Sequence, residues 1–388
     1  MYEYCEAYSI PYRKTGKLVV AHEHQRRYVE SLHNKASKLE WPEPFAGAKH
    51  LSTQVLPTQL LSGDEARELE PDLSPDIASA LLSPETGIID SHSYMESLER
   101  DIMESENGDI AYSTAVVRVD PYDRSKLANG VPDLYAKEAG WIVQLVTRNA
   151  NGTTQEEEEG DALFVRTLIN SSGLSGNLIL NSLLSPEKRI PMYYARGSYA
   201  AYSGSGATHV SRLIYPCPDV KKESEHSFQS LGTHLTLDLA GNIKFGPDIQ
   251  WVSPTGRVSQ VIGEPTTAAN GQGENEEDAS SYEAEDVDFW KRHLVPDDGQ
   301  LSAMYEAVRR YLPNVQASKF RPDYVGIRPK LVPPWGGFQD FVFRRDHSGS
   351  NRSGQGGQMI TLMGIESPGL TASLAIAEKV VSMLEYKE

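Results

Sequence analysis

The stretch that decides the fold reads Met359-Ile-Thr-Leu-Met363, then Gly364-Ile-Glu-Ser-Pro-Gly369, then Leu370-Thr-Ala-Ser-Leu-Ala-Ile-Ala-Glu-Lys-Val-Val-Ser-Met-Leu384. The first run, apolar and β-branched, predicts a strand, and the glycine-bearing segment predicts a tight turn. Apolar residues then recur at helical spacing, at Leu370, Leu374, Ala377, Val381 and Leu384. A strand, turn and amphipathic helix in this order are typical of α/β folds.

The start of this helix is a candidate anion site. Ser367 is predicted as the N-cap residue and Pro368 as the first helical residue. With Gly369 leaving the first turn open, the N–H groups of residues such as Gly369 and Leu370 would point at a ligand beyond the helix. An ordinary last strand with a docking helix fits the same pattern, and the local sequence leaves both interpretations open.

The composition excludes several classes of function. The 388 residues include 37 Lys and Arg against 54 Asp and Glu, a net charge of −17, and no basic block is present, which argues against nucleic-acid binding. Cys5 and Cys217 lie far apart without a C-x-x-C motif, so neither a disulfide framework nor a cysteine zinc site is expected, and no metal is predicted. Each cysteine is interpreted as a small apolar residue.

No apolar run approaches the roughly 20 residues of a membrane span. The N-terminal residues resemble neither a signal peptide nor an Arg-rich transit peptide. A cytoplasmic location is therefore the default expectation, provided that Met1 is the true start.

Two further segments predict strands of an α/β sheet. Asp109–Val119 alternates after a predicted helix capped by Asp90 or Ser91, and this order predicts a βαβ element. Residues 162–169 predict one strand that runs into Asn170-Ser-Ser-Gly-Leu-Ser-Gly176. Such a small-residue turn at the C-terminal end of a strand is where open α/β sheets bind ligands, although a tight connection without a ligand explains the glycines equally well.

From Arg189 onward, short aromatic-rich strands predict the antiparallel sheet of a second domain. In Thr233–Asp238 the alternation places His234 on the polar face, as a solvent-facing or hydrogen-bonded histidine or as a functional one. Residues 264–286 are too polar to join a core and predict a disordered acidic insertion.

Arg328 precedes Pro329 in the predicted strand 323–331. A residue before proline is extended, so its guanidinium is well placed to bind a carboxylate in a bidentate manner. One half of a structural ion pair is the alternative.

Together these segments resemble the FAD-dependent oxidoreductases of the D-amino-acid-oxidase superfamily, and within it the L-2-hydroxyglutarate dehydrogenase-like branch. The matching segments run in family order along the whole chain: 13–21, 86–92, 114–117, 170–174, 213–216, 234–238, 245–248, 326–331 and 364–371. The resemblance implies a mixed α/β fold, in which a Rossmann-like FAD-binding domain is interleaved with an antiparallel-sheet substrate domain. It divides the chain into a mixed segment of the substrate domain (1–80), a part of the FAD domain (81–188), the substrate sheet (189–331) and the C-terminal part of the FAD domain (332–388).

The resemblance also implies site residues. His234 would be the catalytic base, and Arg328 would hold a substrate carboxylate. Tyr199 and Tyr215 would line the substrate pocket, with aromatic packing as the alternative. The residues implied to contact FAD are Val116, Ser172, Gly173, Leu174, Gly364, Ser367, Pro368, Gly369, Leu370 and Thr371.

One departure from the family pattern is large. The family opens with a strand, a G-x-G-x-x-G turn and a helix that bind the FAD pyrophosphate, and residues 1–388 contain no such unit. We therefore expect either an N-terminally truncated chain that lacks a βαβ unit of roughly 30 or more residues, or a chain that has lost flavin binding. A mitochondrial presequence would have been lost with such a segment.

The expected function is FAD-dependent oxidation of a small 2-hydroxy acid similar to L-2-hydroxyglutarate, with hydride transfer to flavin and an unknown electron acceptor. The alternatives are an amino-acid or amine oxidase of the same superfamily, and a non-catalytic remnant that binds a carboxylate or a protein partner without flavin.

Overall fold

The computed structural model describes residues 1–41, 54–122, 139–147, 160–218, 232–252, 293–349 and 356–385. The predicted insertion at 264–286 lies outside these residues. The chain divides into two compact units, which are described separately: unit 1 comprises Met1, Met95–Tyr193 and Arg328–Glu388, and unit 2 comprises Tyr2–Tyr94 and Tyr194–Ile327.

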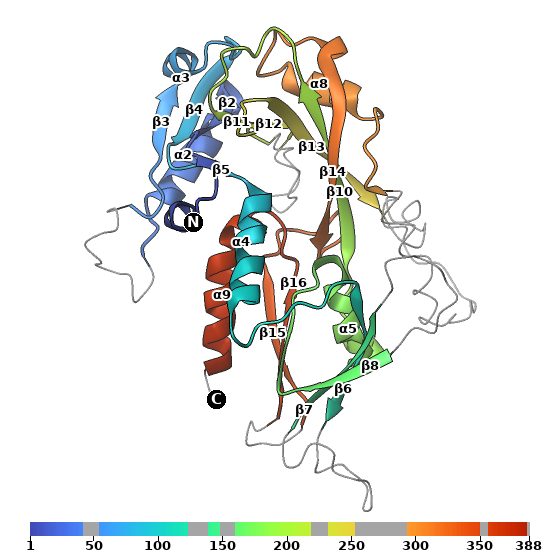
Figure 1. Cartoon of the computed structure of the whole chain (residues 1–388). Helices are drawn as coiled ribbons and strands as arrows, with labels where there is room; N and C mark the ends of the chain where they lie inside the picture. Colours follow the sequence, from blue (N-terminus) through green and yellow to red (C-terminus); the bar gives the residue numbers. More distant parts are fainter. Residues whose placement is uncertain are drawn as a thin grey trace, which may run out of the picture. The chain divides into compact units, whose positions relative to one another are not determined.

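An eight-stranded sheet forms most of unit 2 (Figure 1). Its strands, in spatial order, are β14 (Phe320–Lys330), β10 (Tyr193–Tyr202), β13 (Ile243–Val252), β12 (His234–Leu237), β11 (Leu213–Pro216), β2 (Lys17–His22), β4 (Ile77–Ser83) and β3 (Gln59–Ser62). β11 and β2 run parallel, whereas the pairs from β10 to β11 and from β2 to β3 are antiparallel. The predicted antiparallel sheet is therefore present and is extended by N-terminal strands through one parallel pair.

One face of this sheet carries the core of unit 2. Leu18, Ile214, Leu235 and Phe245 come from four neighbouring strands, and each is 0% exposed. The short helix α8 (Leu301–Val308) packs its buried side chains into the same cluster. Full burial of one such side chain contributes about 1.5–3 kcal/mol, so this face dominates the stability of the unit.

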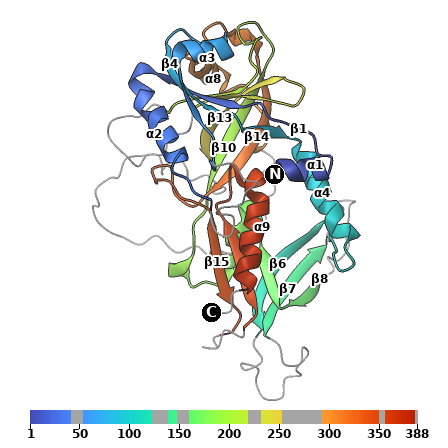
Figure 2. The same ribbon diagram turned by 90° about the vertical axis from the view of Figure 1, so that its left-hand side faces the viewer.

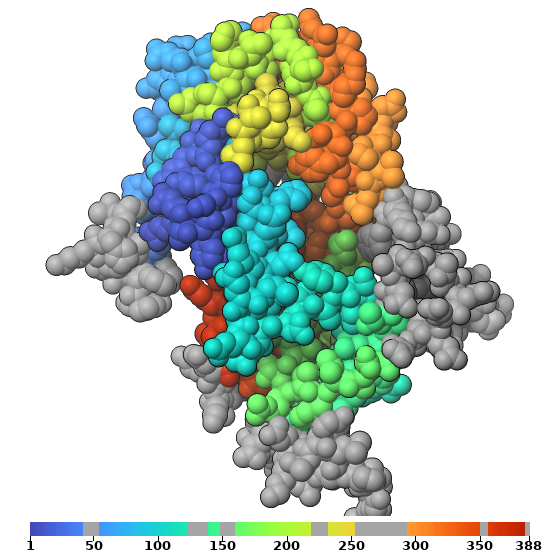
Figure 3. Space-filling model, in the orientation of Figure 1, coloured from blue at the N-terminus to red at the C-terminus, as the bar shows by residue number. Residues whose placement is uncertain are grey.

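Helix α2 (Arg26–Ala36) covers the other face of the sheet at its β2–β4 end, as both ribbon views show (Figures 1 and 2). Val29 packs there with Ala21 and Leu81, whose side chains point away from the main core. In the space-filling view, the N-terminal segment forms part of the outer surface of unit 2 (Figure 3, dark blue). Helix α2 follows a 3₁₀ turn at Glu23–Gln25.

Helix starts follow the predicted capping chemistry in this unit. Ser62 caps α3 (Gly63–Leu69) in a capping box with Glu65. Asp90 caps α4 (Ser91–Glu104), because its carboxylate accepts from the N–H groups of His92 and Ser93 at 3.0 and 3.2 Å. The remaining small elements of this region are α1 (Tyr2–Ala7) and a two-stranded pairing of β1 (Tyr12–Arg13) with β5 (Ile88–Ile89).

Unit 1 is built around a three-stranded sheet of β15 (Val342–His347), β16 (Gln358–Met363) and β9 (Thr167–Asn170). Helix α9 (Gly369–Glu385) packs on one face, where Ile360 and Leu362 meet Val380. Helix α5 (Gly176–Ser182) packs on the other face, where Met359 and Met363 lie in one cluster with its Leu180 (Figure 1). The predicted strand, turn and helix at the C-terminus are therefore confirmed.

Two local predictions in unit 1 are wrong. The segment after α4 forms β6 (Thr114–Tyr122), which pairs antiparallel with β7 (Gly140–Thr147) instead of entering a βαβ element. Residues 162–169 are not one strand: β8 (Gly160–Val165) continues the antiparallel sheet, and β9 pairs parallel with β16. Arg166 separates the two strands, because one straight strand cannot pair with both β7 and β16.

Cys5 and Cys217 are both buried and carry free thiols. Burial raises the pKa of the Cys217 thiol to about 12, which keeps it protonated and unreactive. In the described part of the chain, no helix is long and apolar enough to cross a membrane.

In unit 2, a buried carboxylate connects the C-terminal end of α3 with the residues that precede β11. The side chain of Glu70 is 0% exposed and accepts from Ser211 N at 3.1 Å, Ser211 Oγ at 2.8 Å and Arg212 Nη1 at 3.0 Å. Removing the charge of one partner in such a network leaves the other partners poorly satisfied.

Glu70→Gln is therefore expected to lower the free energy of unfolding by about 1–3 kcal/mol, because Arg212 loses its buried carboxylate. Chemical denaturation measures this change. The matched control is Glu68→Gln at an exposed position of the same helix, with an expected change within about 0.5 kcal/mol. Equal effects of the two substitutions would contradict the role given to Glu70.

Candidate active site

The turn between β16 and α9 contains the predicted flavin-ring residues. Gly364 has φ +66°, and a Cβ atom there would lie 2.9 Å from Leu331 Cδ1, so both the backbone and the packing favour glycine. Thr371 Oγ1 donates to the carbonyl of Pro368 at 3.2 Å. Leu370 is 43% exposed.

The predicted cap of this helix is displaced by one residue. The first α-helical hydrogen bond runs from Ala372 N to Pro368 O at 3.0 Å, and α9 begins at Gly369, so Pro368 is the N-cap residue instead of Ser367. The Ser367–Pro368 peptide bond is cis. The N–H group of Gly369 is not free, because it donates to the carbonyl of Glu366. Among the hydrogen bonds described for this turn, the N–H groups of Leu370 and Thr371 have no acceptor, and they are the donors left for an anion.

Glu366 in the same turn binds two cations from β14. Its Oε2 atom lies 3.4 Å from Arg328 Nη1, and its Oε1 atom contacts Lys330 Nζ. The three side chains are between 15% and 29% exposed. The ion-pair alternative for Arg328 is thus realised, and the group it binds is a carboxylate. One carboxylate balances only one of the two cations, so a positive charge remains at this turn.

The small-residue turn after β9 is held by Asn170. Its Nδ2 donates to Gly176 O at 2.9 Å, and its Oδ1 accepts from Ser172 Oγ at 2.7 Å. Gly173 has φ +61°, and a Cβ atom placed there would meet nothing within 4 Å. The backbone at Gly173 therefore borders open space. Val116, on β6 of the same unit, is 40% exposed.

In unit 2, His234 and Tyr215 form a stacked pair on two neighbouring strands of the eight-stranded sheet. Their ring centroids are 4.0 Å apart and their planes are inclined by 20°. They sit on β12 and β11, one residue along from the paired Ile214 and Leu235, whose side chains point into the core. His234 is 7% exposed, so the solvent-facing alternative is wrong and the hydrogen-bonded one is correct.

The contact of His234 Nδ1 with the carbonyl of Gly232, at 3.2 Å, determines its tautomer. A carbonyl oxygen only accepts, so Nδ1 carries the proton in this contact. The lone pair of the neutral ring is then on Nε2, which is the atom that can accept a proton from a substrate.

Tyr199 stacks on Tyr324 on the same sheet, with centroids 4.3 Å apart and planes inclined by 12°. Burial, together with the neighbouring Tyr199, raises the pKa of Tyr324 well above its usual value. The aromatic-packing alternative for Tyr199 is therefore observed. Tyr324, Glu366 and Lys330 were not predicted from the sequence. Of these three residues, Lys330 could have been found, because a residue two positions after Arg328 in a strand lies on the same face of the sheet.

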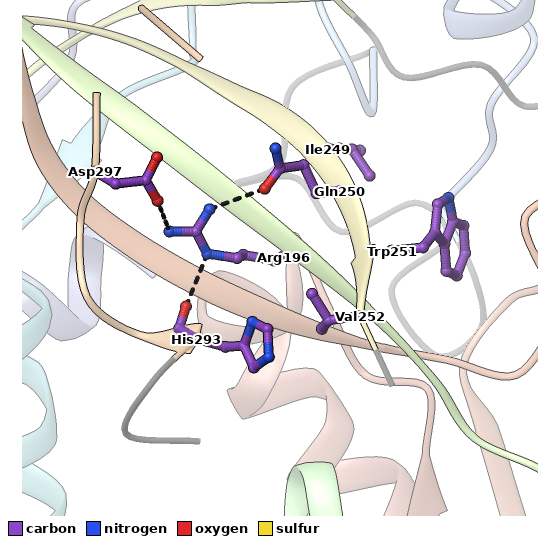
Figure 4. A pocket seen from close by; sticks show the side chains of 7 residues that line it. All are labelled: Arg196, Ile249, Gln250, Trp251, Val252, His293 and Asp297. Atoms are coloured by element: carbon purple, nitrogen blue, oxygen red, sulfur yellow. Dashed lines mark hydrogen bonds and ion pairs between the residues drawn. The ribbon is translucent and has the colours of Figure 1, made fainter. Parts of the chain in front are cut away.

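A cavity of about 580 Å³ opens on β13 beside Arg196 (Figure 4). The Arg196 guanidinium is hydrogen-bonded in several directions: Nε donates to His293 O at 2.8 Å, Nη1 to Gln250 Oε1 at 2.9 Å, and Nη2 to Val295 O at 2.9 Å and Asp297 Oδ2 at 2.7 Å. Since its donors are used to fix residues 293–297, we interpret Arg196 as structural. None of the site residues predicted from the sequence lines this cavity.

Comparison with known proteins identifies the family expected from the sequence, over almost the whole chain. The family model described as "DAO: FAD dependent oxidoreductase" matches residues 1–383. The chain belongs to this family. A relative from Arabidopsis thaliana, named mitochondrial L-2-hydroxyglutarate dehydrogenase, is 31% identical over 98% of this chain and 68% of its own length. A bacterial relative of the same name from Indibacter alkaliphilus is 23% identical over 97% of this chain and 79% of its own length.

Solved structures agree on the fold. The L-proline dehydrogenase of P. horikoshii superposes with a TM-score of 0.60 at 14% identity, over 99% of this chain and 75% of its own. The FAD-bound L-α-glycerophosphate oxidase of Mycoplasma pneumoniae gives 0.57 at 17% identity, over 97% of this chain and 74% of its own. At these identities the likeness establishes a mixed α/β fold of the flavin oxidoreductases, and the family prediction made from the sequence is confirmed.

The residues of unit 1 fit the cofactor of this family. The open backbone at Gly173 allows close approach of a dinucleotide, and the Leu370 and Thr371 N–H groups at the start of α9 suit the electron-rich end of a flavin ring.

Proposed function

We propose that this chain oxidises a small 2-hydroxy acid of the L-2-hydroxyglutarate type to the corresponding 2-oxo acid. The observation that carries the proposal is the 31% identity to a protein named L-2-hydroxyglutarate dehydrogenase over 98% of the chain. Positive charge at the Arg328–Lys330–Glu366 cluster and a histidine with a defined tautomer support it.

Arg328 is proposed to bind a substrate carboxylate. Its guanidinium already contacts the carboxylate of Glu366 at 3.4 Å, which is longer than a strong charge-assisted hydrogen bond. A substrate carboxylate can therefore compete for the remaining donors of Arg328 while Lys330 keeps Glu366 in place. Because the pair is only partly exposed, water competes less than at the surface.

His234 is proposed to be the base. Its Nε2 lone pair would take the hydroxyl proton of the substrate, leaving an imidazolium. The Gly232 carbonyl then accepts a charge-assisted hydrogen bond from Nδ1, which stabilises the protonated ring. FAD, when bound, supplies the acceptor for the hydrogen and electron pair that leave the same substrate carbon.

We propose that Ser172, Gly173, Leu174 and the residues from Gly364 to Thr371 hold the cofactor, together with Val116. An amino-acid oxidase is the second candidate function, and it would release ammonia and peroxide from an amine substrate. The named relatives favour the hydroxy acid.

The substrate proposal predicts that L-2-hydroxyglutarate, and not L- or D-amino acids, reduces an artificial electron acceptor in the presence of the purified protein and FAD. The absorbance spectrum of the protein measures flavin content in the same sample. Ammonia release from amino acids without turnover of the hydroxy acid would contradict the proposal and favour the second candidate.

His234→Asn is expected to lower kcat/KM by about 10²- to 10⁴-fold, because the base is lost, while flavin content is unchanged. Steady-state kinetics measure kcat/KM, and the flavin absorbance measures the flavin content. The control is Thr236→Val, two residues further along the same face of β12, where kcat/KM is expected to stay within about twofold. An equal loss in both variants would make His234 a structural residue.

Arg328→Ala is expected to raise KM by about 10- to 100-fold with little change in flavin content, because hydrogen bonds to charged groups contribute about 1.5–3 kcal/mol. The control is Arg321→Ala at an exposed position of β14. If Arg328→Ala removes flavin and substrate affinity to the same extent, then its ion pair with Glu366 has only a structural role.

A further inference from the structure

Lys17 stands beside the His234–Tyr215 pair. Its ammonium lies 5.0 Å from the ring centroid of Tyr215, and that ring stacks on His234 at 4.0 Å. The three residues lie on the neighbouring strands β2, β11 and β12. Lys17 precedes Leu18 and His234 precedes Leu235, and both leucines are in the core, so Lys17 and His234 share the opposite face.

The charge of Lys17 is poorly compensated. Within the described residues, its ammonium has no carboxylate partner, and burial lowers its pKa below the usual lysine value. Its contact with the Tyr215 ring is a cation–π interaction, which contributes only about 0.5–2 kcal/mol. A half-buried ammonium with one aromatic neighbour therefore gains free energy when a carboxylate arrives.

Two other lysines that lie over a tyrosine ring, Lys14 and Lys244, differ in this respect. Lys14 lies over the ring of Tyr2 and also contacts Glu85 at 2.8 Å. Lys244 lies 5.1 Å from the ring centroid of Tyr324 and contacts Asp323 at 2.6 Å. In both cases an aromatic ring and a carboxylate share the ammonium, whereas at Lys17 the position of the carboxylate is open.

We propose that Lys17 binds a second carboxylate of the substrate and thereby selects dicarboxylic over monocarboxylic 2-hydroxy acids. The inference rests on the proposed function, in which Arg328 takes one carboxylate and His234 takes the hydroxyl proton. Lys17 touches the ring that stacks on the base, so an anion bound to Lys17 lies on the His234 face of the sheet. L-2-hydroxyglutarate carries two carboxylates, and Lys17 would bind one of them.

The test uses glutarate and pentanoate, two non-oxidisable acids of equal chain length that differ by one carboxylate. Their dissociation constants are measured by isothermal titration calorimetry with the purified protein in the presence of FAD. Lys17→Met keeps most of the apolar stem and removes the charge, and Lys17→Arg keeps the charge. Lys244→Met is the matched control, because its ammonium lies at a similar distance from a tyrosine ring but already has a carboxylate partner.

Wild-type protein is expected to bind glutarate more tightly than pentanoate. In Lys17→Met, the Kd of glutarate rises at least about tenfold, which corresponds to about 1.4 kcal/mol, while the Kd of pentanoate stays within about twofold. Lys17→Arg retains most of the preference for glutarate over pentanoate, and Lys244→Met retains all of this preference. Thermal melting of each variant checks that the fold is intact, and Lys17→Gln replaces Lys17→Met if the latter fails to fold.

Three results would overturn the proposal. If Lys17→Met still binds glutarate more tightly than pentanoate, or if the affinities for both acids fall equally, Lys17 does not recognise the second carboxylate. The proposed oxidation of a 2-hydroxy acid is unaffected by either result. If the wild-type protein does not distinguish glutarate from pentanoate, the dicarboxylate substrate fails together with the role of Lys17. Turnover of L-2-hydroxyglutarate separates these cases from failure of the enzyme activity itself.

Discussion

The two-residue period of β-strand side chains is the constraint on which unit 2 depends. Leu18, Ile214 and Leu235 all point to one face and are completely buried, so Lys17 and His234, which directly precede two of them in the sequence, are committed to the other face. A shift of one residue in the pairing of β11 with β2 or β12 would place His234 or Lys17 in the core, at a large desolvation cost. The hydrophobic core thus fixes the position of the polar residues that we assign to chemistry.

The charges on that face are distributed unevenly. Lys244 on β13 is paired with Asp323 on β14, and its ammonium also lies over the ring of Tyr324 on β14. On β2, three strands away from β13, Lys17 has an aromatic ring beside it and, among the described residues, no carboxylate. Unpaired charge in a half-buried position is costly in the free protein, and a substrate of opposite charge recovers this free energy on binding. The same reasoning applies in unit 1, where Glu366 neutralises one of the charges of Arg328 and Lys330 and leaves the other.

Much of the fold could be predicted from the sequence because the signals are local. The alternation around His234, the cap at Asp90 and the strand, turn and helix at the C-terminus each depend on residues within a few positions of one another. Residues 162–169 misled the prediction because the break at Arg166 arises from pairing with two different sheets, which is a long-range property. The cap at Pro368 differed by one residue because Ser367, the better capping type, lies in the turn before the helix.

The candidate site shows the same division between local and long-range information. His234, Tyr215 and Arg328 could be proposed from residue type and family resemblance, but their partners could not. Glu366 lies 38 residues from Arg328 in the chain, and Tyr215 and His234 come from strands joined by a long connection. Lys17 is the strongest example, since in the sequence it is one polar residue at the start of an apolar strand. Its chemical character comes from a tyrosine almost two hundred positions away, because the parallel pairing of β2 with β11 brings the two together. At Lys17 this pairing brings a ring but, within the described residues, no carboxylate, so the carboxylate that binds its ammonium is expected to come from the ligand.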